Sequence, residues 1–316
     1  MNEGCICNIE IKNEKRSKVM EEKRVLAVMG SPSSGKTTTA IKLASLLAEK
    51  KKNVILVFCD PFTPVIPTIL PVTVDHETSL GKLLTAPSLT QTMILQACVP
   101  TENDYISVLG YKKGESLMYY PTILREQVIE LFVFLRHLAD YVIIDCSSVF
   151  EADPTSIVAI EVADQVLKLG TANLKGISYY QTHEKMLVDS CFKKERQKMA
   201  IGVLQVGQDW EAVSSQYGGV DFVLPYVEEL DQQNNELCLF KSLHTTESKA
   251  YQREVEHMMK GLFGIEEFEK KEKSKKVKKQ AEERKEKEEK KVEREKKTKS
   301  FSFSFSNFLG KKKGEF

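Results

Sequence analysis

The segment that most constrains the fold of this chain is the octapeptide Gly30-Ser31-Pro32-Ser33-Ser34-Gly35-Lys36-Thr37. It fits the pattern G-x-x-x-x-G-K-[ST], in which backbone N–H groups of the loop and of the next helix point at phosphate groups. The sequence predicts a buried strand before this motif, at residues 25–29, and an amphipathic helix after it, at residues 36–50. This strand–loop–helix context predicts a phosphate-binding loop in an α/β fold.

The residues of the loop have separate expected roles. Lys36 is expected to reach the β- and γ-phosphates of a nucleotide, and the Thr37 hydroxyl is expected to bind Mg²⁺. Gly35 allows the backbone to approach the phosphates closely. The predicted nucleotide-binding residues of this segment are Gly30, Ser31, Pro32, Ser33, Ser34, Gly35, Lys36, Thr37 and Thr38.

Two aspartates that end predicted strands are candidates for further roles. Asp145 follows the apolar strand at residues 141–144 and is the candidate carboxylate for Mg²⁺, although such an aspartate also occurs in ordinary turns. Asp60 follows the strand at residues 54–58, at the sheet edge where α/β proteins bind ligands. It is expected either to position or activate the attacking water or to serve a structural Asp-Pro turn.

The remaining pattern predicts strands that alternate with helices, and therefore a mostly parallel sheet with helices on both faces. We place this domain at residues 23–265. Weaker strands are expected at residues 105–109, 165–169, 201–206 and 221–225. Further helices are expected from Pro121, placed in a first turn, to about Ala139, and near residues 174–190 and 245–262.

Charge is distributed unevenly along the chain. The total of +1 is the sum of about −8 over residues 1–268 and +9 over residues 269–316. Residues 1–22 are expected to be a polar leader, and residues 266–299 a Lys/Glu-rich extension, either a solvated helix or disordered. In residues 300–316, phenylalanines alternate with serines and precede three lysines.

This C-terminal tip has several possible roles. Aromatic side chains beside lysines suit peripheral contact with an anionic membrane surface, whereas an alternating strand suits addition to a partner protein's sheet. A disordered tip is the third possibility, and the many glutamates before it weaken nucleic-acid binding. Without a run of eighteen apolar residues or a signal-peptide pattern, the chain is expected to be cytoplasmic, with possible peripheral contact at the inner face of the membrane.

At this point the sequence resembles the ParA/MinD group of ATPases, including CpaE-like members associated with pilus and secretion systems. The resemblance rests on residues 30–39 (GSPSSGKTTT), 54–61 (VILVFCDP) and 141–148 (YVIIDCSS). Softer matches are residues 162–166 and 223–226. Their order and spacing agree over about 240 residues.

The resemblance implies a P-loop NTPase of the SIMIBI-like class that uses ATP and Mg²⁺ and forms ATP-dependent homodimers. It implies Lys36 on phosphate, Thr37 and Asp145 at the metal, and Asp60 positioning the catalytic water. Pro225 would lie near the adenine, and Gln205 stands where the family usually has an adenine-reading asparagine.

Two departures from the family pattern bear on the expected activity. Ser31 occupies the position of a second lysine that reaches the partner's nucleotide, and a hydroxyl supplies no positive charge to the transition state. Hydrolysis is therefore expected to be slow. Ser148 replaces a glycine three residues after the metal aspartate, which puts a second, backbone-sensing switch in doubt.

The function expected from these features is a nucleotide-dependent switch for assembly or positioning of a pilus, secretion or conjugation apparatus, with a protein partner in a membrane-associated machine. A ParA-like partition ATPase for DNA or other cargo is the first alternative. A small-molecule kinase is the second, and it would need an arginine-rich lid, for which the domain offers Arg125, Arg136, Arg196 and Arg253.

Overall fold

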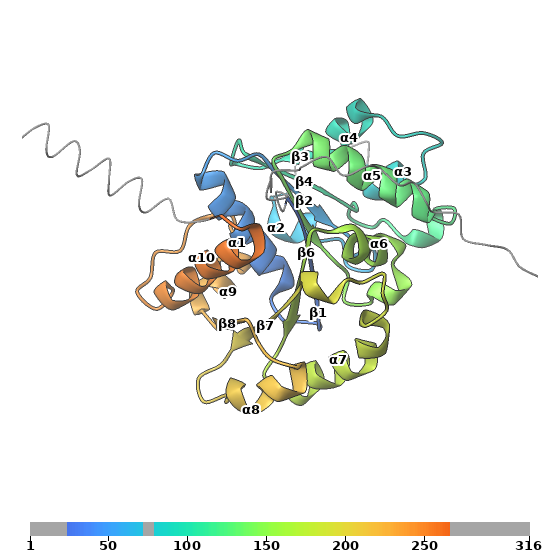
Figure 1. Ribbon diagram of the computed structural model, residues 1–316. Helices are drawn as coiled ribbons and strands as arrows, with labels where there is room; N and C mark the ends of the chain where they lie inside the picture. The colour runs from blue at the N-terminus through green and yellow to red at the C-terminus, as the bar shows by residue number, and fades with distance from the viewer. Residues whose placement is uncertain (1–23, 72–78, 266–316) are drawn as a thin grey trace, which may run out of the picture. The chain divides into compact units, whose positions relative to one another are not determined.

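Eight strands form one sheet in the computed structural model, which describes residues 24–71 and 79–265 (Figure 1). Their order across the sheet is β3-β4-β2-β5-β1-β6-β7-β8, and every pairing is parallel except that of β3 with β4. The strands are β1 (Val25–Gly30), β2 (Val54–Phe58), β3 (Val99–Pro100), β4 (Ile106–Gly110), β5 (Tyr141–Asp145), β6 (Gln165–Gly170), β7 (Gln197–Leu204) and β8 (Phe222–Pro225). The predicted leader, Lys/Glu-rich extension and C-terminal tip lie outside the described residues.

Helices cover both faces of this sheet (Figure 1). They are α1 (Lys36–Glu49), α2 (Ile66–Ile69), α3 (Leu80–Leu84), α4 (Gln91–Ala97), α5 (Arg125–Leu138), α6 (Pro154–Val162), α7 (Leu174–Leu187), α8 (Trp210–Ser214), α9 (Glu228–Asn235) and α10 (Lys249–Phe263). Single 3₁₀ turns are η1 (Leu117–Tyr119), η2 (Phe150–Ala152), η3 (Lys194–Arg196) and η4 (Ser215–Tyr217). None of the described helices has the length and apolarity needed to cross a membrane.

The core has two layers because successive side chains of a strand point to opposite faces. In β1, Val25, Ala27 and Met29 pack with the helices α3 to α7, whereas Leu26 and Val28 pack with α1 and α10. All six residues of β1 are buried, which explains its continuous apolar run. The predicted α/β class, with a mostly parallel sheet covered on both faces, is confirmed.

Element boundaries differ from the prediction in places. Pro121 does not lie in the first turn of a helix, because residues 121–124 are not helical and α5 begins at Arg125. The Gln127 side chain accepts a hydrogen bond from the Leu124 backbone N–H, which caps the helix at that later position. The strand expected at residues 201–206 begins four residues earlier, at Gln197.

Both edges of the sheet are formed by short strands that contain proline. At one edge, β3 has two residues, runs antiparallel to β4 and ends at Pro100. At the other edge, β8 has four residues and ends at Pro225. Proline has no backbone N–H and is tolerated in a sheet mainly at such edges.

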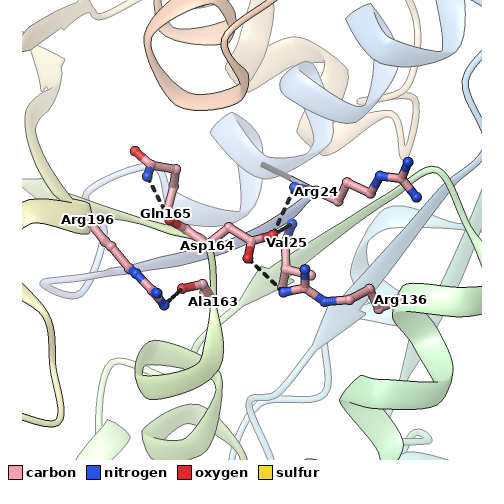
Figure 2. Close-up of polar contacts among 7 residues, drawn as sticks. All are labelled: Arg24, Val25, Arg136, Ala163, Asp164, Gln165 and Arg196. Atoms are coloured by element: carbon pink, nitrogen blue, oxygen red, sulfur yellow. Dashed lines mark hydrogen bonds and ion pairs between the residues drawn. The ribbon is translucent and has the colours of Figure 1, made fainter. Parts of the chain in front are cut away.

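The opposite end of the sheet from the loop is held by Asp164 (Figure 2). Its Oδ2 accepts hydrogen bonds from the backbone N–H groups of Arg24 and Val25, each at 2.9 Å, at the start of β1. Its Oδ1 accepts a hydrogen bond from the guanidinium of Arg136 on α5 at 2.7 Å. Nearby, Arg196 donates to the Ala163 carbonyl at 3.1 Å. Asp164, the residue directly before β6, therefore joins α5 to the start of β1.

Replacing Asp164 with asparagine should lower the free energy of unfolding by about 1–3 kcal/mol, because the amide NH₂ cannot accept a hydrogen bond and one donor loses its charged partner. Urea denaturation of Asp164→Asn, compared with Glu130→Gln at an exposed position of α5, measures this effect. Equal midpoints for the two variants would contradict the assigned role.

Candidate functional site

The predicted phosphate-binding loop connects β1 to α1, as its sequence context required. Gly35 precedes the first helical residue with φ of 84° and ψ of 21°, a left-handed conformation that favours glycine. Within the loop, the Ser34 backbone N–H and hydroxyl both donate to the Ser31 carbonyl, at 3.3 and 2.8 Å. The loop is thus curled ahead of the helix N-terminus.

Strands β6 and β7 support the loop closely. A Cβ atom at Gly30 would lie 2.0 Å from the Leu169 carbonyl oxygen, and one at Gly202 would lie 2.0 Å from the Ser34 carbonyl oxygen. The next residue, Val203, has φ of 54°, an uncommon conformation for a β-branched residue, where the pairing of β7 with β8 is irregular. Only glycine at these two contact positions lets the loop pack against the neighbouring strands.

Lys36 lies between the loop and the segment that follows β5. Its ammonium donates to the Ser148 hydroxyl at 2.6 Å and to the Ser31 carbonyl at 3.2 Å. Burial lowers the pKa of Lys36, while the negative charges of Asp145 and Asp60 act in the opposite direction. A cation desolvated in this way interacts strongly with an added phosphate.

Thr37 and Asp145 meet as predicted for a metal site. The Thr37 hydroxyl donates to Asp145 Oδ2 at 2.5 Å, and Asp145 Oδ1 is buried without a hydrogen-bond partner among the described residues. Hydroxyl and carboxylate oxygens are ligands that Mg²⁺ prefers, and the unpartnered Oδ1 leaves acceptor capacity. These two residues therefore fit Mg²⁺ held together with nucleotide phosphates. No group of three or more His, Cys, Asp or Glu side chains in the described part forms a separate metal site.

Asp145 gives the site a pH dependence. Burial raises its pKa to about 6, although Lys36 and Thr37 favour the ionised form. A carboxyl group whose pKa is raised by folding stabilises the folded state increasingly as the pH falls through 6, with full effect below its unfolded value near 4. Above pH 6 the ionised carboxylate opposes folding.

Accordingly, Asp145→Asn should raise the free energy of unfolding of the nucleotide-free protein at pH 8, by on the order of 1–3 kcal/mol. The gain should shrink as the pH falls from 6 toward 4, where the wild-type carboxyl is protonated. Thermal denaturation across this pH range, with Asp104→Asn as an exposed control, measures the effect. A gain that does not vary with pH would be inconsistent with this origin.

Asp60 lies at the same sheet edge, directly after β2. Its Oδ1 accepts hydrogen bonds from the backbone N–H groups of Phe62 at 2.9 Å and Thr63 at 3.0 Å. The structural turn considered from the sequence is therefore present. Asp60 also interacts electrostatically with Lys36 and Asp145, and no described residue hydrogen-bonds to its Oδ2. The geometry is thus compatible with both roles expected for this side chain.

Two depressions flank the phosphate-binding loop. The two residues predicted near the nucleobase, Pro225 and Gln205, lie in different ones. One is lined by Gly35, Thr38, Pro225 and Tyr226, with Tyr251 at its inner wall. This depression joins Pro225 to the loop, and the placement of Pro225 near an adenine stays a prediction.

The second depression lies on the other side of the loop. Its lining includes Ser31, Pro32, Ser33 and Gln205. The structure does not bring Gln205 into the depression that contains Pro225, because the chain passes the loop at Val203, which lines both.

Two contact residues of the site were not predicted in their observed roles. Ser148 was identified only as a departure from a family glycine, yet its hydroxyl accepts the Lys36 hydrogen bond and its carbonyl accepts one from Tyr179 at 2.9 Å. Gly202 was not singled out, although an isolated glycine within a strand pattern often marks a close approach of two backbones. That signal was present in the sequence.

These features define a P-loop nucleotide-binding protein. Residues 26–179 match the family model of an AAA domain. No curated protein sequence matches this chain.

Comparison with solved structures specifies the fold more narrowly. The chain is similar to a ParA family ATPase from Chlorobium tepidum TLS, with 16% identity and a TM-score of 0.60, covering 75% of this chain and 98% of that one. It is also similar to the cell-division ATPase MinD from Pyrococcus furiosus, with 18% identity, a TM-score of 0.58 and coverages of 75% and 99%. A third similar structure is a putative plasmid partition protein from Borrelia burgdorferi B31 bound to AMPPNP. The identity is 17% and the TM-score is 0.58, and the match covers 75% of this chain and 98% of that one.

At these identities the likeness establishes the fold. In its fold, the chain is a P-loop protein of the ParA/MinD type, which confirms the resemblance drawn from the sequence. The CpaE-like branch stays a prediction.

Proposed function

We propose that this protein binds ATP with Mg²⁺, hydrolyses it slowly, and acts as a nucleotide-dependent switch. The observation that carries the proposal is the meeting of Lys36, Thr37 and Asp145 at the N-terminus of α1. Backbone N–H groups at that terminus and the Lys36 ammonium suit phosphates, and the oxygens of Thr37 and Asp145 suit Mg²⁺. Bound Mg²⁺ would neutralise charge on the phosphates during hydrolysis.

ATP is the nucleotide we assign. Pro225 and Tyr226 line the depression beside Thr38, and such apolar and aromatic groups suit the face of a nucleobase. Among proteins of the same fold, a MinD from Pyrococcus horikoshii is described as complexed with Mg-ADP, and a McdA variant from Cyanothece as complexed with ATP. Fluorescence titration with a labelled ATP analogue, with and without Mg²⁺, tests the assignment. Equal affinity for GTP would contradict it.

Slow hydrolysis follows from Ser31. Its side chain is buried and its hydroxyl has no hydrogen-bond partner among the described residues. This position supplies no positive charge to a nucleotide of the same chain or of a second one. Lys36 is therefore the cation that the described loop offers to the phosphates.

A small-molecule kinase is disfavoured because the described residues form no arginine-rich lid over the phosphate-binding loop. The four arginines considered for such a lid are bound elsewhere: Arg125 to Glu161, Arg136 to Asp164, Arg196 to the Ala163 carbonyl and Arg253 to the Lys249 carbonyl. None of these contacts lies on the phosphate-binding loop, so the described arginines do not surround a transferred phosphoryl group.

We also propose that the loop-bearing edge of the sheet binds a second copy of this chain when ATP is present. Large apolar side chains are exposed in the segments that follow the carboxyl ends of five strands. They are Phe62 after β2, Met118 and Tyr119 after β4, Val149 after β5, Leu174 after β6 and Val206 after β7. Exposed apolar groups gathered at one edge of the sheet indicate an interaction surface. Because the phosphate-binding loop lies at the same edge, a bound nucleotide would form part of this surface.

Sedimentation velocity with and without ATP tests this surface. The double substitution Leu174→Ser/Val206→Ser should abolish an ATP-dependent dimer while leaving ATP binding intact, whereas Leu95→Ser on α4 should leave both unchanged. A wild-type chain that binds ATP and stays monomeric would overturn the dimer and leave the nucleotide site standing.

We further propose that the switch serves a pilus, secretion or conjugation apparatus and acts in the cytoplasm, with peripheral contact at the inner face of the membrane. Residues 300–316, whose composition supports the membrane contact, lie outside the described residues. The similarity to a plasmid partition protein favours a partition ATPase as the second candidate. ATP-dependent binding of DNA would favour the partition ATPase. If the protein does not bind DNA with ATP present, the switch for a pilus, secretion or conjugation apparatus is favoured.

A further inference from the structure

Strand β6 carries a lysine where its neighbours carry apolar residues. Lys168 lies in register between Met29 of β1 and Met199 of β7. Its side chain shares a sheet face with Val166, which belongs to the core under the helices. No described residue accepts a hydrogen bond from the Lys168 ammonium or pairs with it. A half-buried cation in a central strand carries a desolvation cost that this packing does not offset.

Lys168 faces a cavity of about 390 Å³ between the sheet and α7, which we call the α7 cavity. Met199, Leu187 and Val220 form apolar parts of its lining, and Tyr180 and Tyr217 form aromatic parts. The volume lies in the range of cavities that bind small molecules.

The charged groups that line the α7 cavity include both signs without a hydrogen-bond or ion-pair partner among the described residues: Lys168 and Lys194 are the cations, and Glu184 is the anion. The Asp221 carboxylate is occupied, since it accepts from Lys198 at 3.0 Å and from the Met199 N–H at 2.8 Å. The Glu184 carboxylate on α7 has no hydrogen-bond or ion-pair partner among the described residues. Lys194 lines the rim and is exposed. Burial and the Lys194 charge lower the pKa of Lys168, whereas Glu184 and Asp221 raise it.

We propose that the α7 cavity binds a small zwitterion of the amino-acid type, with its carboxylate on Lys168 and its ammonium on Glu184. A ligand with both charges gives each group a charge-assisted hydrogen bond. A dianion such as phosphate would pair with Lys168 and Lys194, but it would leave Glu184 without a partner and would meet the negative charges of Glu184 and Asp221 in the same space. The amide groups of Gln181 and Gln216 in the lining, which have no hydrogen-bond partner among the described residues, suit a polar side chain on the ligand.

One backbone carbonyl connects the α7 cavity to the phosphate-binding loop. Tyr180, a wall of the cavity, donates from its hydroxyl to the Leu169 carbonyl at 3.0 Å. The same carbonyl accepts a hydrogen bond from the Ser31 N–H at 3.1 Å. A ligand that moves Tyr180 therefore acts on a group that holds the loop, and the ligand should change ATP affinity. This coupling rests on the proposed function, whereas binding in the cavity does not.

Binding is tested with the full chain, by calorimetric titration with the standard free L-amino acids. Each acid that binds is then compared with its analogue lacking the amino group. Lys168→Met and Glu184→Gln should each weaken binding by about tenfold or more, the loss of one charge-assisted hydrogen bond. Lys185→Met, also on α7 but outside the cavity lining, should bind as the wild type does. Thermal denaturation of each variant confirms that it is folded.

Several results would overturn the proposal. No saturable binding of any amino acid, or equal binding by folded Lys168→Met, would exclude the site. Equal binding of the amine-free analogue, together with no effect of Glu184→Gln, would exclude a zwitterion as the ligand. Amino-acid binding in a chain that does not bind ATP would uphold the cavity and reject the nucleotide site, so the two proposals fail separately.

Discussion

Lys36→Ala should reduce ATP affinity by at least about a hundredfold, because two or more charge-assisted hydrogen bonds to phosphate are lost together. The wild-type ammonium is almost fully buried and already held between Ser31 and Ser148, so a phosphate displaces few waters from it. Titration with a labelled ATP analogue measures the loss. Lys52→Ala, an exposed lysine just after α1, serves as the charge-matched control.

Removing Lys36 also leaves the buried Asp145 without the cation that favours its ionised form. The variant must therefore be shown to fold, by circular dichroism and thermal denaturation, before its affinity is interpreted. Lys36→Met keeps the length of the side chain and provides a second test. Unchanged affinity in both folded variants would exclude the phosphate-binding role.

The second large effect is expected at Asp60, where substitution should reduce turnover without reducing ATP binding. Asp60→Asn retains an oxygen that can accept the hydrogen bonds from Phe62 and Thr63, so the turn after β2 is kept. It removes the negative charge that would orient or deprotonate the attacking water. The loss in rate should be about 10²- to 10⁴-fold, the usual contribution of a positioned acid or base.

Formation of phosphate in acid-quenched samples under single-turnover conditions measures this rate, since quenching releases the product and makes the result independent of product dissociation. Asp60→Ala, which removes both the turn and the carboxylate, separates the two roles. If Asp60→Asn hydrolyses ATP at the wild-type rate and only Asp60→Ala is slow, Asp60 is a turn residue and another group positions the water.

The site was predictable where its signals are local in sequence. A buried strand, two glycines at fixed spacing and an apolar helix face placed Lys36 and Thr37 correctly on α1. Asp145 was identifiable because parallel strands end at one edge, and β5 lies directly beside β1. Because all parallel strands of a sheet end at one edge, these residues could be identified before the order of the strands was known.

Other contacts between distant segments were not predictable. The hydrogen bond from Lys36 to Ser148 joins residues 112 positions apart, and Asp164 caps a strand about 140 positions before it. Short helices such as α9, with the sequence EELDQQNN, have too little apolar periodicity to be recognised. Lys168 looked like part of a weak strand, and only the sheet order showed that this strand lies between β1 and β7.

The prolines at the two edges of the sheet have a consequence for how copies of this protein associate. A strand from another chain that approached β3 or β8 would meet Pro100 or Pro225, each of which lacks the N–H needed to continue a ladder. Growth of the sheet from molecule to molecule by pairing of exposed edge strands is thereby discouraged. Exposed apolar side chains can then gather at the loop-bearing edge for reversible association without also promoting open-ended polymerisation.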